Sequence, residues 1–312
     1  MPAPAISILI PAHNAAPWIE ACVASALAQT LPPLEVLVWE DGSTDATPAI
    51  LKTFGEKIRV LGGKNIGSNP GRNRLLAEAR GDWVQFLDAD DALLPDKLAL
   101  QWAETPAPDN TDVIYSPTLD ETWEGTQRLV SRVTSEVDPK RDLFEQWFLW
   151  QLSQTNGSLW RRMALTRLGG WNEAQSCCQD NELYARALRA GLRFHFAPNA
   201  RAIHRAWSEQ SVSRRNPAKV LQEKTRLIDE MVGWMRSRAV LERRHLEAAG
   251  RACFEIARTL ARSDLPAASA YLRQRREHFA VRPSGPAAPM SYRLAYYLLG
   301  FGAAEKLARH LR

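Results

Sequence analysis

The sequence predicts an α/β fold: a mainly parallel sheet flanked by helices, followed by a helical C-terminal extension. In the first hundred residues, short runs rich in β-branched side chains alternate with segments of helical spacing. Such alternation is typical of a parallel sheet that helices cover on both faces. Beyond residue 217 the apolar spacing is helical almost throughout, so a separate helical region is expected there.

Strands are expected where short apolar runs end at turn residues, and helices where capping residues or proline precede helical spacing. The expected strands are residues 6–10, 35–40, 58–61, 83–87 and 157–160. The expected helices are residues 17–29, 47–54, 71–80, 95–104, 141–151, 162–168, 179–190, 217–235, 241–262, 266–278 and 291–311. Residues 120–137 are polar with alternating character and are expected to form a hairpin.

The composition indicates a soluble globular protein of one large domain plus an appendage: 312 residues, 45% hydrophobic and 24% charged. No stretch reaches the roughly 20 apolar residues that span a bilayer. The apolar run at residues 6–10 ends at Pro11 and fits a first strand better than a signal peptide. Four cysteines without paired or CxxC spacing favour a reducing cytoplasm.

The net charge of +5 is divided unevenly along the chain. Residues 1–213 hold 20 basic and 26 acidic residues, a net charge of −6, whereas residues 214–312 hold 20 basic and 9 acidic residues, a net charge of +11. This contrast predicts a first domain at residues 1–213 and a basic helical region at residues 214–312. A basic region can meet anionic lipid, nucleic acid or an acidic domain of its own chain. Because no nucleic-acid reader motif is visible, a nucleic-acid partner is not expected.

An acidic cluster, Asp88-Ala89-Asp90-Asp91, directly follows the apolar run at residues 83–87. Clustered carboxylates repel one another, and a desolvated anion needs a partner. In extended chain Asp88 and Asp90 point to the same side, where a hard cation such as Mg²⁺ could join them to substrate phosphates. The cluster therefore suggests an enzyme that holds a metal-bound diphosphate. The alternative is a polar loop whose aspartates cap the helix that begins near Pro95.

Polar clusters follow the other expected strands as well. His13-Asn14 comes after the first strand, residues 41–45 after the second, and residues 88–91 after the fourth. In open parallel sheets, ligands bind at the carboxyl ends of the strands. We therefore expect the three clusters to converge on one site.

With these segments in view, the chain resembles the family 2 glycosyltransferases over residues 5–215. That family has the GT-A fold, with a Rossmann-like sheet. The matching segments, in the family's order, are ISILIPAHN at residues 6–14, EVLVWEDGSTD at 35–45, NIGSNPGRN at 65–73, GDWVQFLDADD at 81–91, GGWNE at 169–173 and QDNELYARALRAG at 179–191. Six ordered segments are specific for the family, but they identify neither the donor sugar nor the acceptor.

The resemblance implies a role for each matching residue. The nucleotide would be bound by the turn after the first strand, by the acid after the second strand, and by an arginine near the diphosphate. These positions are Pro11, Ala12, His13, Asn14, Asp41 and Arg72. A carboxylate at residue 41 suits the imide N–H of uracil, so a UDP-sugar is favoured, although guanine also offers donors. The alternatives are a turn-shaping Asp41, a plain loop His13 and a solvated Arg72.

By the same resemblance, Asp90 would bind Mg²⁺ or Mn²⁺ directly, and Asp88 would lie near the ribose and the waters of the metal. Asp180 would be the general base that deprotonates the acceptor hydroxyl. Its alternative role is in a helix N-terminus, where Ser176-x-x-Gln179 has the form of a capping box.

The chain departs from the family's pattern at two positions. Gln179 stands where relatives usually have Glu, and Trp207 stands where many have His in an Arg-x-His element. Arg205 matches the Arg of that element, and His204 lies out of register. The Ser211-Val212-Ser213 segment that often follows is present.

The resemblance, together with the acidic cluster after the fourth strand, implies a metal-dependent, inverting glycosyltransferase. The sugar of a nucleoside-diphosphate sugar would pass to a hydroxyl of a saccharide or lipid-linked acceptor, in cell-surface polysaccharide assembly. One alternative is a nucleotidyltransferase, which would need a Gly-rich basic loop where this chain has residues 11–14. The other is a non-catalytic nucleotide-sugar-binding or assembly protein.

The last expected helix, residues 291–311, combines aromatic and leucine side chains with Arg293, Lys306 and Arg309. Aromatic residues flanked by cations suit a membrane interface. This predicts peripheral attachment to an anionic membrane on its cytoplasmic face. Packing against the acidic first domain, or a homodimer contact through the C-terminal helices, remain alternatives.

Overall fold

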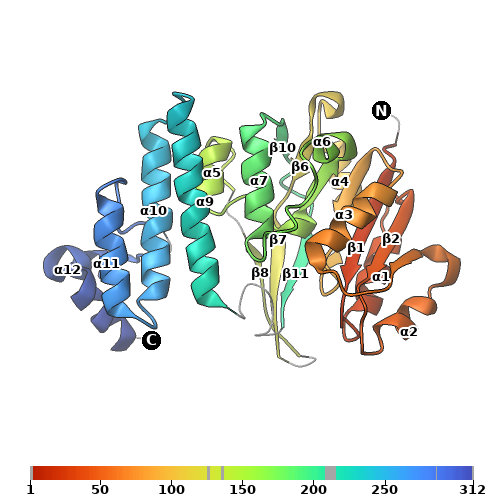
Figure 1. Cartoon of the computed structure of the whole chain (residues 1–312), viewed down its shortest axis with the longest axis horizontal. Helices are drawn as coiled ribbons and strands as arrows, with labels where there is room; N and C mark the ends of the chain where they lie inside the picture. Colours follow the sequence, from red (N-terminus) through yellow and green to blue (C-terminus); the bar gives the residue numbers. More distant parts are fainter. Residues whose placement is uncertain (1–2, 125–126, 135–136, 208–215, 286, 311–312) are drawn as a thin grey trace. The chain divides into compact units, whose positions relative to one another are not determined.

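The computed structural model describes residues 3–124, 127–134, 137–207, 216–285 and 287–310 (Figure 1). The chain divides into two compact units. The first comprises Met1–Pro139 and Leu152–Glu209, and the second comprises Lys140–Gln151 and Gln210–Arg312. Residues 140–151, which the sequence placed in the first domain, thus belong to the second unit. The predicted boundary between residues 213 and 214, like the segment 211–213, lies outside the described residues.

The first unit contains the predicted mainly parallel sheet. Its strands are β1 (Ile6–Ala12), β2 (Glu35–Glu40), β3 (Arg59–Gly62), β4 (Trp83–Phe86), β6 (Val113–Tyr115), β9 (Ser158–Arg161) and β10 (Phe194–Phe196). Among the described residues they form one seven-stranded sheet in the order β10-β6-β9-β4-β1-β2-β3. Neighbours pair in parallel, except that β9 is antiparallel to both β4 and β6.

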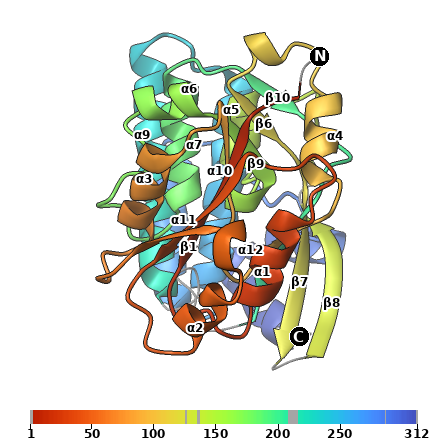
Figure 2. The same ribbon diagram turned by 90° about the vertical axis from the view of Figure 1, so that its right-hand side faces the viewer.

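Helices cover both faces of this sheet. They are α1 (Ile19–Leu27), α2 (Thr47–Lys52), α3 (Ser68–Glu78), α4 (Lys97–Ala103), α6 (Arg162–Arg167) and α7 (Gln179–Arg189), with short 3-10 turns η1 (Gly55–Lys57), η2 (Pro108–Asn110) and η3 (Thr155–Gly157). Figure 2 shows α1 and α3 on opposite sides of β1. Ile6, Ile8 and Ile10 lie in one core with the buried residues of α1, so the alternate residue Leu9 points to the other face.

A second sheet forms beside the acidic cluster. Its strands are β5 (Ala92–Leu93), β7 (Thr118–Glu124), β8 (Gln127–Thr134) and β11 (Ala202–Ala206), in the order β5-β11-β7-β8. The β7–β8 pair is the hairpin that the sequence predicted. Strands β5, β6, β10 and β11 were not among the predicted strands. The antiparallel pairing of Ile203 with Ala92 brings the end of β11 next to residues 88–91.

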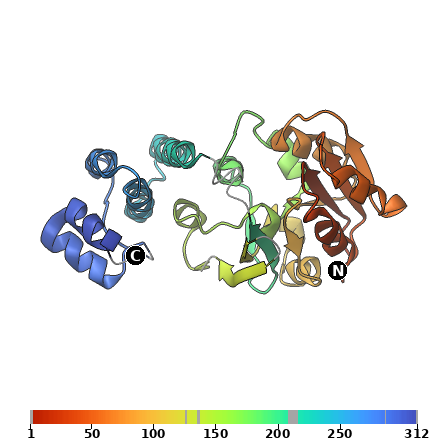
Figure 3. The ribbon, with the colours of Figure 1, turned by 90° about the horizontal axis from the view of Figure 1, so that it is seen from below.

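The second unit is helical, as predicted. It contains α5 (Leu143–Phe148), α9 (Pro217–Ser237), α10 (Arg243–Leu260), α11 (Leu265–Arg276) and α12 (Met290–His310). Figure 3 shows the teal and blue helices α9, α10 and α11 nearly end-on, so their axes run side by side. The expected single helix at residues 291–311 is kinked at Gly300, whose φ of 81° is non-helical. No helix among the described residues has the length and apolar character that a membrane crossing needs.

Asp142 explains why α5 joins the C-terminal helices. Its Oδ1 accepts the N–H of Glu145 at 2.8 Å and caps α5, and its Oδ2 lies 2.7 Å from Nε2 of His245 at the start of α10. The other ring nitrogen of His245, Nδ1, accepts the N–H of Glu242 at 3.0 Å. The ring therefore carries its proton on Nε2 and donates it to Asp142. Because His245 is buried, the loss of this acceptor would leave a donor unsatisfied.

Asp142→Ala should lower the free energy of unfolding by about 2 kcal/mol, because it removes both a helix cap and the partner of a buried imidazole. Asp142→Asn keeps an oxygen acceptor and should cost less than half as much. Denaturant unfolding of the two variants measures the difference. Equal stability of Asp142→Ala and the wild type would mean that α5 and α10 do not depend on this residue.

Candidate active site

The three polar clusters meet at one edge of the sheet, as the sequence predicted. Strands β2, β1 and β4 are parallel neighbours, so Asp41, His13 and Asp88 follow them on the same side. Nδ1 of His13 lies 2.9 Å from the carbonyl oxygen of Asp41. Asn14, with a left-handed φ of 49°, accepts the N–H of Thr44 at 2.8 Å through Oδ1. Pro11 and Ala12 form the last register pairs of β1 with β2. The turns after β1 and β2 are therefore tied to each other.

Asp41 is buried, and its carboxylate holds the loop before α3. Its oxygens accept the N–H of Ile66 at 2.7 Å, the N–H of Gly67 at 2.9 Å and the indole N–H of Trp39 at 3.1 Å. A carboxylate has about four lone-pair sites, so one further donor can be accepted. In this structure Asp41 thus orders the loop around residues 65–67, and its contact with a nucleotide base stays a prediction.

Arg72 lies at the centre of the site. It is 5% exposed, so it is not the solvated helix residue considered above. Nη2 donates to Oδ1 of Asp88 at 2.6 Å, and Nη1 donates to Asn69 at 2.8 Å and to Gln179 at 3.1 Å. The guanidinium also lies over the ring of Trp171, 4.5 Å from its centroid. Its Nε is buried and has no hydrogen-bond partner among the described residues, so one donor of the guanidinium is unsatisfied.

The helix that carries Arg72 reaches the sheet because a glycine precedes that residue. A Cβ at Gly71 would come within 2.8 Å of the Trp39 ring on β2. Any larger side chain at this position would therefore push α3 away from the sheet. The glycine of the NPGR segment thus explains how the buried guanidinium reaches the end of β4.

The three carboxylates after β4 have different surroundings. Asp88 is half-buried and paired with Arg72. Asp90 accepts the indole N–H of Trp207 through Oδ2 at 2.9 Å. Asp91 is buried and accepts the side-chain amide of Asn156 at 2.9 Å and the backbone N–H of Arg205 at 2.8 Å. Asp91 therefore fixes the turn to the second sheet, whereas Asp88 and Asp90 lie within electrostatic reach of each other, and their joint role at a metal site stays a prediction.

Electrostatics in this turn favour added positive charge. Burial, and then repulsion from Asp88, raise the pKa of Asp90, while the hydrogen bond from Trp207 acts to lower it. Burial and the charge of Asp90 raise the pKa of Asp91 well above its usual value. Burial acts to lower the pKa of His204, but Asp120 and Asp91 outweigh it and raise that pKa to about 9. An imidazolium at His204 therefore offsets part of the acidic charge at neutral pH.

Asp180 lies in the first turn of α7, within electrostatic reach of Asp88 and Arg72. Burial, and then the charge of Asp88, raise its pKa, against a hydrogen bond from the N–H of Asn181 at 2.8 Å. The capping-box interpretation is wrong, because Cys178 and not Ser176 occupies the N-cap position. Gln179 turns its amide toward Ser68 and Arg72 instead. Substitution of Gln for the family's Glu thus keeps an acceptor for Arg72 but removes a charge.

The donor set fits a divalent cation held together with a substrate. No group of three or more His, Cys, Asp or Glu side chains is placed to hold a metal ion within the described part of the chain. Asp88 and Asp90 nevertheless supply two carboxylates, and burial and the charge of Asp88 raise the pKa of Asp90. Mg²⁺ is commonly bound by one or two carboxylates plus phosphates and waters, so two are sufficient.

Comparisons with known proteins decide the family. The family model for glycosyl transferase family 2 matches residues 7–168. The chain belongs to the family 2 glycosyltransferases. Chondroitin synthase of Pasteurella multocida is 41% identical over 100 residues, which are 31% of this chain and 10% of that protein. Putative glycosyltransferase EpsH of Bacillus subtilis is 33% identical over 117 residues, 36% of this chain and 33% of EpsH. The matches thus span a third or less of these relatives.

Solved structures support the GT-A fold that was predicted for a member of this family. S. aureus TarS 1-349 in complex with UDP-GlcNAc aligns with a TM-score of 0.65 and 19% identity, over 99% of this chain and 92% of that one. Mannosyltransferase PcManGT from Pyrobaculum calidifontis, in complex with GDP-Man and Mn²⁺, aligns with a TM-score of 0.53 and 18% identity, over 99% of this chain and 88% of that one. At these identities the likeness establishes the fold.

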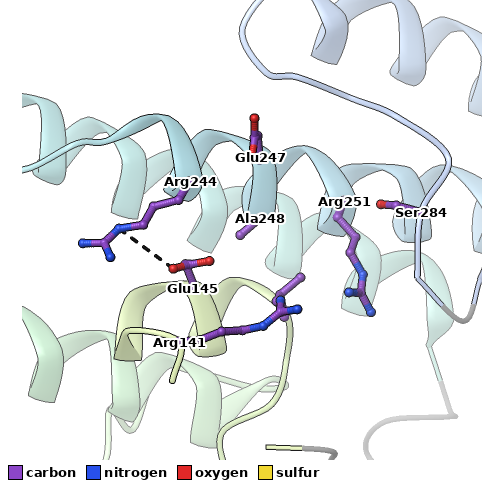
Figure 4. Close-up of a pocket in the computed structure, with 8 residues that line it drawn as sticks. Arg141, Glu145, Arg244, Glu247, Ala248, Arg251 and Ser284 are labelled. Carbon is purple, nitrogen blue, oxygen red and sulfur yellow. Dashed lines mark ion pairs between the residues drawn. The ribbon is translucent and has the colours of Figure 1, made fainter. Parts of the chain in front are cut away.

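An open pocket of about 360 Å³ in the second unit contains none of the predicted site residues (Figure 4). It lies between α5 and α10, where the side chains of Arg141 and Arg251 extend into a common space and Arg244 pairs with Glu145 at 3.9 Å. Because the six matching segments of the sequence all lie in the first unit, the sheet edge and not this pocket is the candidate active site.

Asp180→Asn should raise the midpoint of thermal unfolding at neutral pH. A carboxyl whose folded pKa lies above its unfolded value of about 4 destabilises the fold as pH rises through that interval. A neutral amide avoids this cost. The increase in the unfolding midpoint should therefore be full above the folded pKa and vanish below about pH 4. Thermal unfolding of both proteins across this pH range measures it.

Asp45→Asn is the matched control, because the pKa of Asp45 is shifted in the opposite direction to that of Asp180. Although partial burial acts to raise the pKa of Asp45, hydrogen bonds from Thr47 and Ala16 hold it below its usual value. Its substitution should therefore lower the midpoint at neutral pH. If Asp180→Asn also lowered the midpoint, the carboxylate of Asp180 would stabilise α7 and would not be an unfavourably buried charge.

Proposed function

We propose that this chain is a metal-dependent, inverting glycosyltransferase. It transfers a sugar from a nucleoside-diphosphate sugar, with UDP favoured, to a hydroxyl of a saccharide or lipid-linked acceptor in cell-surface polysaccharide assembly. The observation that carries the proposal is the buried Arg72 paired with Asp88, with Asp180 within electrostatic reach of both. The names of chondroitin synthase and hyaluronan synthase among the relatives support polysaccharide assembly. UDP-GlcNAc on TarS and GDP-Man on PcManGT support a nucleotide-sugar donor.

Arg72 would bind the diphosphate of the donor. A guanidinium is planar and always charged, and it matches phosphate oxygens with paired donors. Its Nε is buried without a hydrogen-bond partner among the described residues, and a phosphate bound against the guanidinium would satisfy that donor. Stacking on Trp171 and the bonds to Asn69 and Gln179 hold the group in place before the donor arrives. Such preorganisation lets binding energy orient the leaving group instead of ordering the protein.

Asp90 and Asp88 would hold Mg²⁺ or Mn²⁺ beside the diphosphate. When bound, the cation supplies positive charge that stabilises the diphosphate as it leaves. The fold also fixes the orientation of the two carboxylates. Asp88 is fixed by Arg72 and Asp90 by Trp207, so neither carboxylate needs to reorganise.

Asp180 would accept the proton of the acceptor hydroxyl. A base with a raised pKa is stronger, and it retains its negative charge at neutral pH if that pKa stays below 7. The hydroxyl attacks the anomeric carbon on the face opposite the diphosphate, which inverts the anomeric configuration. The charge of Asp88 destabilises the deprotonated base and so favours proton uptake.

The two alternative functions are less well supported. A nucleotidyltransferase would use a flexible Gly-rich loop after β1, but Asn14 is tied to Ser43 and Thr44 across the site. A non-catalytic binding protein needs no base, and the energetic cost of a desolvated Asp180 would then bring no benefit. A panel of nucleotide sugars, assayed for nucleoside-diphosphate release with Mn²⁺ and with Mg²⁺, separates transfer from mere binding.

Asp180→Asn should reduce sugar transfer by about 10²-fold or more, since general bases contribute 10²–10⁴-fold. UDP affinity measured by calorimetry should change less than about 2-fold, because the nucleotide does not depend on the base. In the wild type, kcat/KM should fall as pH drops through the raised pKa of Asp180, since the protonated carboxyl cannot accept the proton. Asp82→Asn, at an exposed position before β4, serves as the control. Loss of UDP binding in Asp180→Asn would instead make Asp180 a donor-site residue.

We further propose that α12 attaches the protein to an anionic membrane surface on its cytoplasmic face. One side of the helix packs on Phe254 through Tyr292, Tyr296 and Phe301. Another side leaves five large apolar side chains exposed: Met290, Leu294, Tyr297, Leu298 and Leu299, which we call the α12 patch. Residues 214–312 carry a net charge of +11, which complements anionic lipid.

The double variant Leu294→Ser, Leu298→Ser should lose most sedimentation with vesicles that contain anionic phosphatidylserine. The wild type should sediment with these vesicles, bind less as salt rises, and ignore neutral vesicles. Leu129→Ser, which changes a leucine on β8 that is 50% exposed, is the matched control and should bind like the wild type. If the wild type stays in the supernatant and light scattering shows a dimer that the double variant lacks, the patch is a self-association surface instead.

A further inference from the structure

The acidic turn after β4 is held by a tryptophan from the end of β11. The indole N–H of Trp207 donates to Oδ2 of Asp90 at 2.9 Å. The backbone fixes this meeting, because β11 pairs antiparallel with β5, which directly follows the turn. Arg205 adds two bonds, from its N–H to Asp91 at 2.8 Å and from Nη1 to the carbonyl of Asp90 at 3.1 Å. The position of Trp207 beside Asp90 is therefore set by secondary structure.

Packing also limits how the indole can turn. Its ring lies 5.8 Å from that of Trp18, which in turn meets Trp123 edge-on at 5.0 Å. The guanidinium of Arg205 lies over both of these rings, 5.1 Å from the centroid of Trp18 and 5.9 Å from that of Trp123. Three separate elements, namely the start of α1, β7 and β11, thus contribute to one aromatic cluster. A side chain held in this way can orient the carboxylate that it contacts.

The contact with Trp207 affects how Asp90 can bind a cation, because an indole donates a hydrogen bond but does not bind metals. An indole N–H is only a donor and cannot ligate a metal. It occupies Oδ2 of Asp90, and Arg72 occupies Oδ1 of Asp88. Each of the two carboxylates therefore keeps one oxygen that receives no hydrogen bond from another side chain of the described residues. Two oxygens fall short of the six ligands that Mg²⁺ prefers, so phosphate and water oxygens must complete the set.

We propose that Trp207 is a positioning residue that holds Asp90 with one oxygen available, so that the chain takes up its divalent cation only together with the donor's diphosphate. This inference rests on the proposed function, because it takes Asp90 as the metal ligand. A side chain at residue 207 that ligates metals would remove the dependence on nucleotide. A ring without the N–H would release Asp90 and weaken uptake of the cation.

Electron paramagnetic resonance of free Mn²⁺ tests this without any turnover. The wild type should bind Mn²⁺ weakly alone and at least tenfold more tightly with UDP present. Trp207→His should bind Mn²⁺ without UDP at least tenfold more tightly than the wild type does. Trp207→Phe should weaken binding in the presence of UDP about fivefold. Trp102→Phe, on α4 and edge-on to Trp83, should match the wild type throughout.

Asp90→Asn separates failure of this inference from failure of the proposed function. If Asp90→Asn binds Mn²⁺ with UDP as well as the wild type does, the metal site itself is misassigned and the inference falls with it. If Asp90→Asn abolishes that binding while Trp207→Phe binds like the wild type, the inference alone is overturned. Tight Mn²⁺ binding by the wild type without UDP would overturn it too. Should Trp207→His not fold, as judged by its melting curve, the wild-type and Trp207→Phe titrations decide.

Discussion

The geometry of the site depends on one buried guanidinium. Arg72 joins three pieces of chain that are far apart in sequence: α3 through Asn69, the end of β4 through Asp88, and the start of α7 through Gln179. Removing one partner of a buried charge is costly, because the remaining charge is left uncompensated. The three pieces are therefore fixed relative to one another. Since Asp180 directly follows Gln179, the same interaction sets where the proposed base lies.

Around this cation the chain gathers carboxylates that the fold alone does not stabilise. Burial and mutual repulsion raise the pKa of Asp90, Asp91 and Asp180. Raised pKa values of this kind concentrate at functional sites, because a structure under selection for stability alone would avoid them. Asp91 has a structural use, since it ties the turn to Asn156 and Arg205. Asp90 accepts a bond from Trp207 and Asp180 one from the N–H of Asn181, yet both keep a raised pKa, which supports their proposed roles in binding a cation and in proton transfer.

Much of the fold and the site could be predicted from the sequence, because both rest on local patterns. The strands of the parallel sheet appear as apolar runs, and the site residues follow them directly. The missed elements depend on tertiary pairing. Strands β5 and β10 have only two and three residues, too few to show a period. Residues 141–151 were predicted as a helix rich in Trp and Phe, but the pattern does not reveal that the partner of Asp142 is His245, 103 positions away.

The same limit applied to the two departures from the family's pattern. Gln179 and Trp207 could be noticed in the sequence, but their contacts could not. The capping-box interpretation of Ser176 and Gln179 was wrong because the backbone turns at Cys178, where φ is 53°, and sends the amide of Gln179 toward Arg72. The contact of Trp207 with Asp90 requires the antiparallel pairing of β11 with β5, which no local pattern indicates.

Calorimetric titration of UDP in the presence of Mn²⁺ tests the role of Arg72 most directly. The comparison is between the wild type, Arg72→Lys and Arg74→Lys, whose residue lies exposed on the same helix. Lysine keeps the charge but cannot donate to several partners in one plane. Arg72→Lys should bind UDP at least tenfold more weakly, a loss of about 1.4 kcal/mol, while Arg74→Lys binds like the wild type. A folded Arg72→Lys variant with wild-type affinity would contradict the assignment of the diphosphate to this guanidinium.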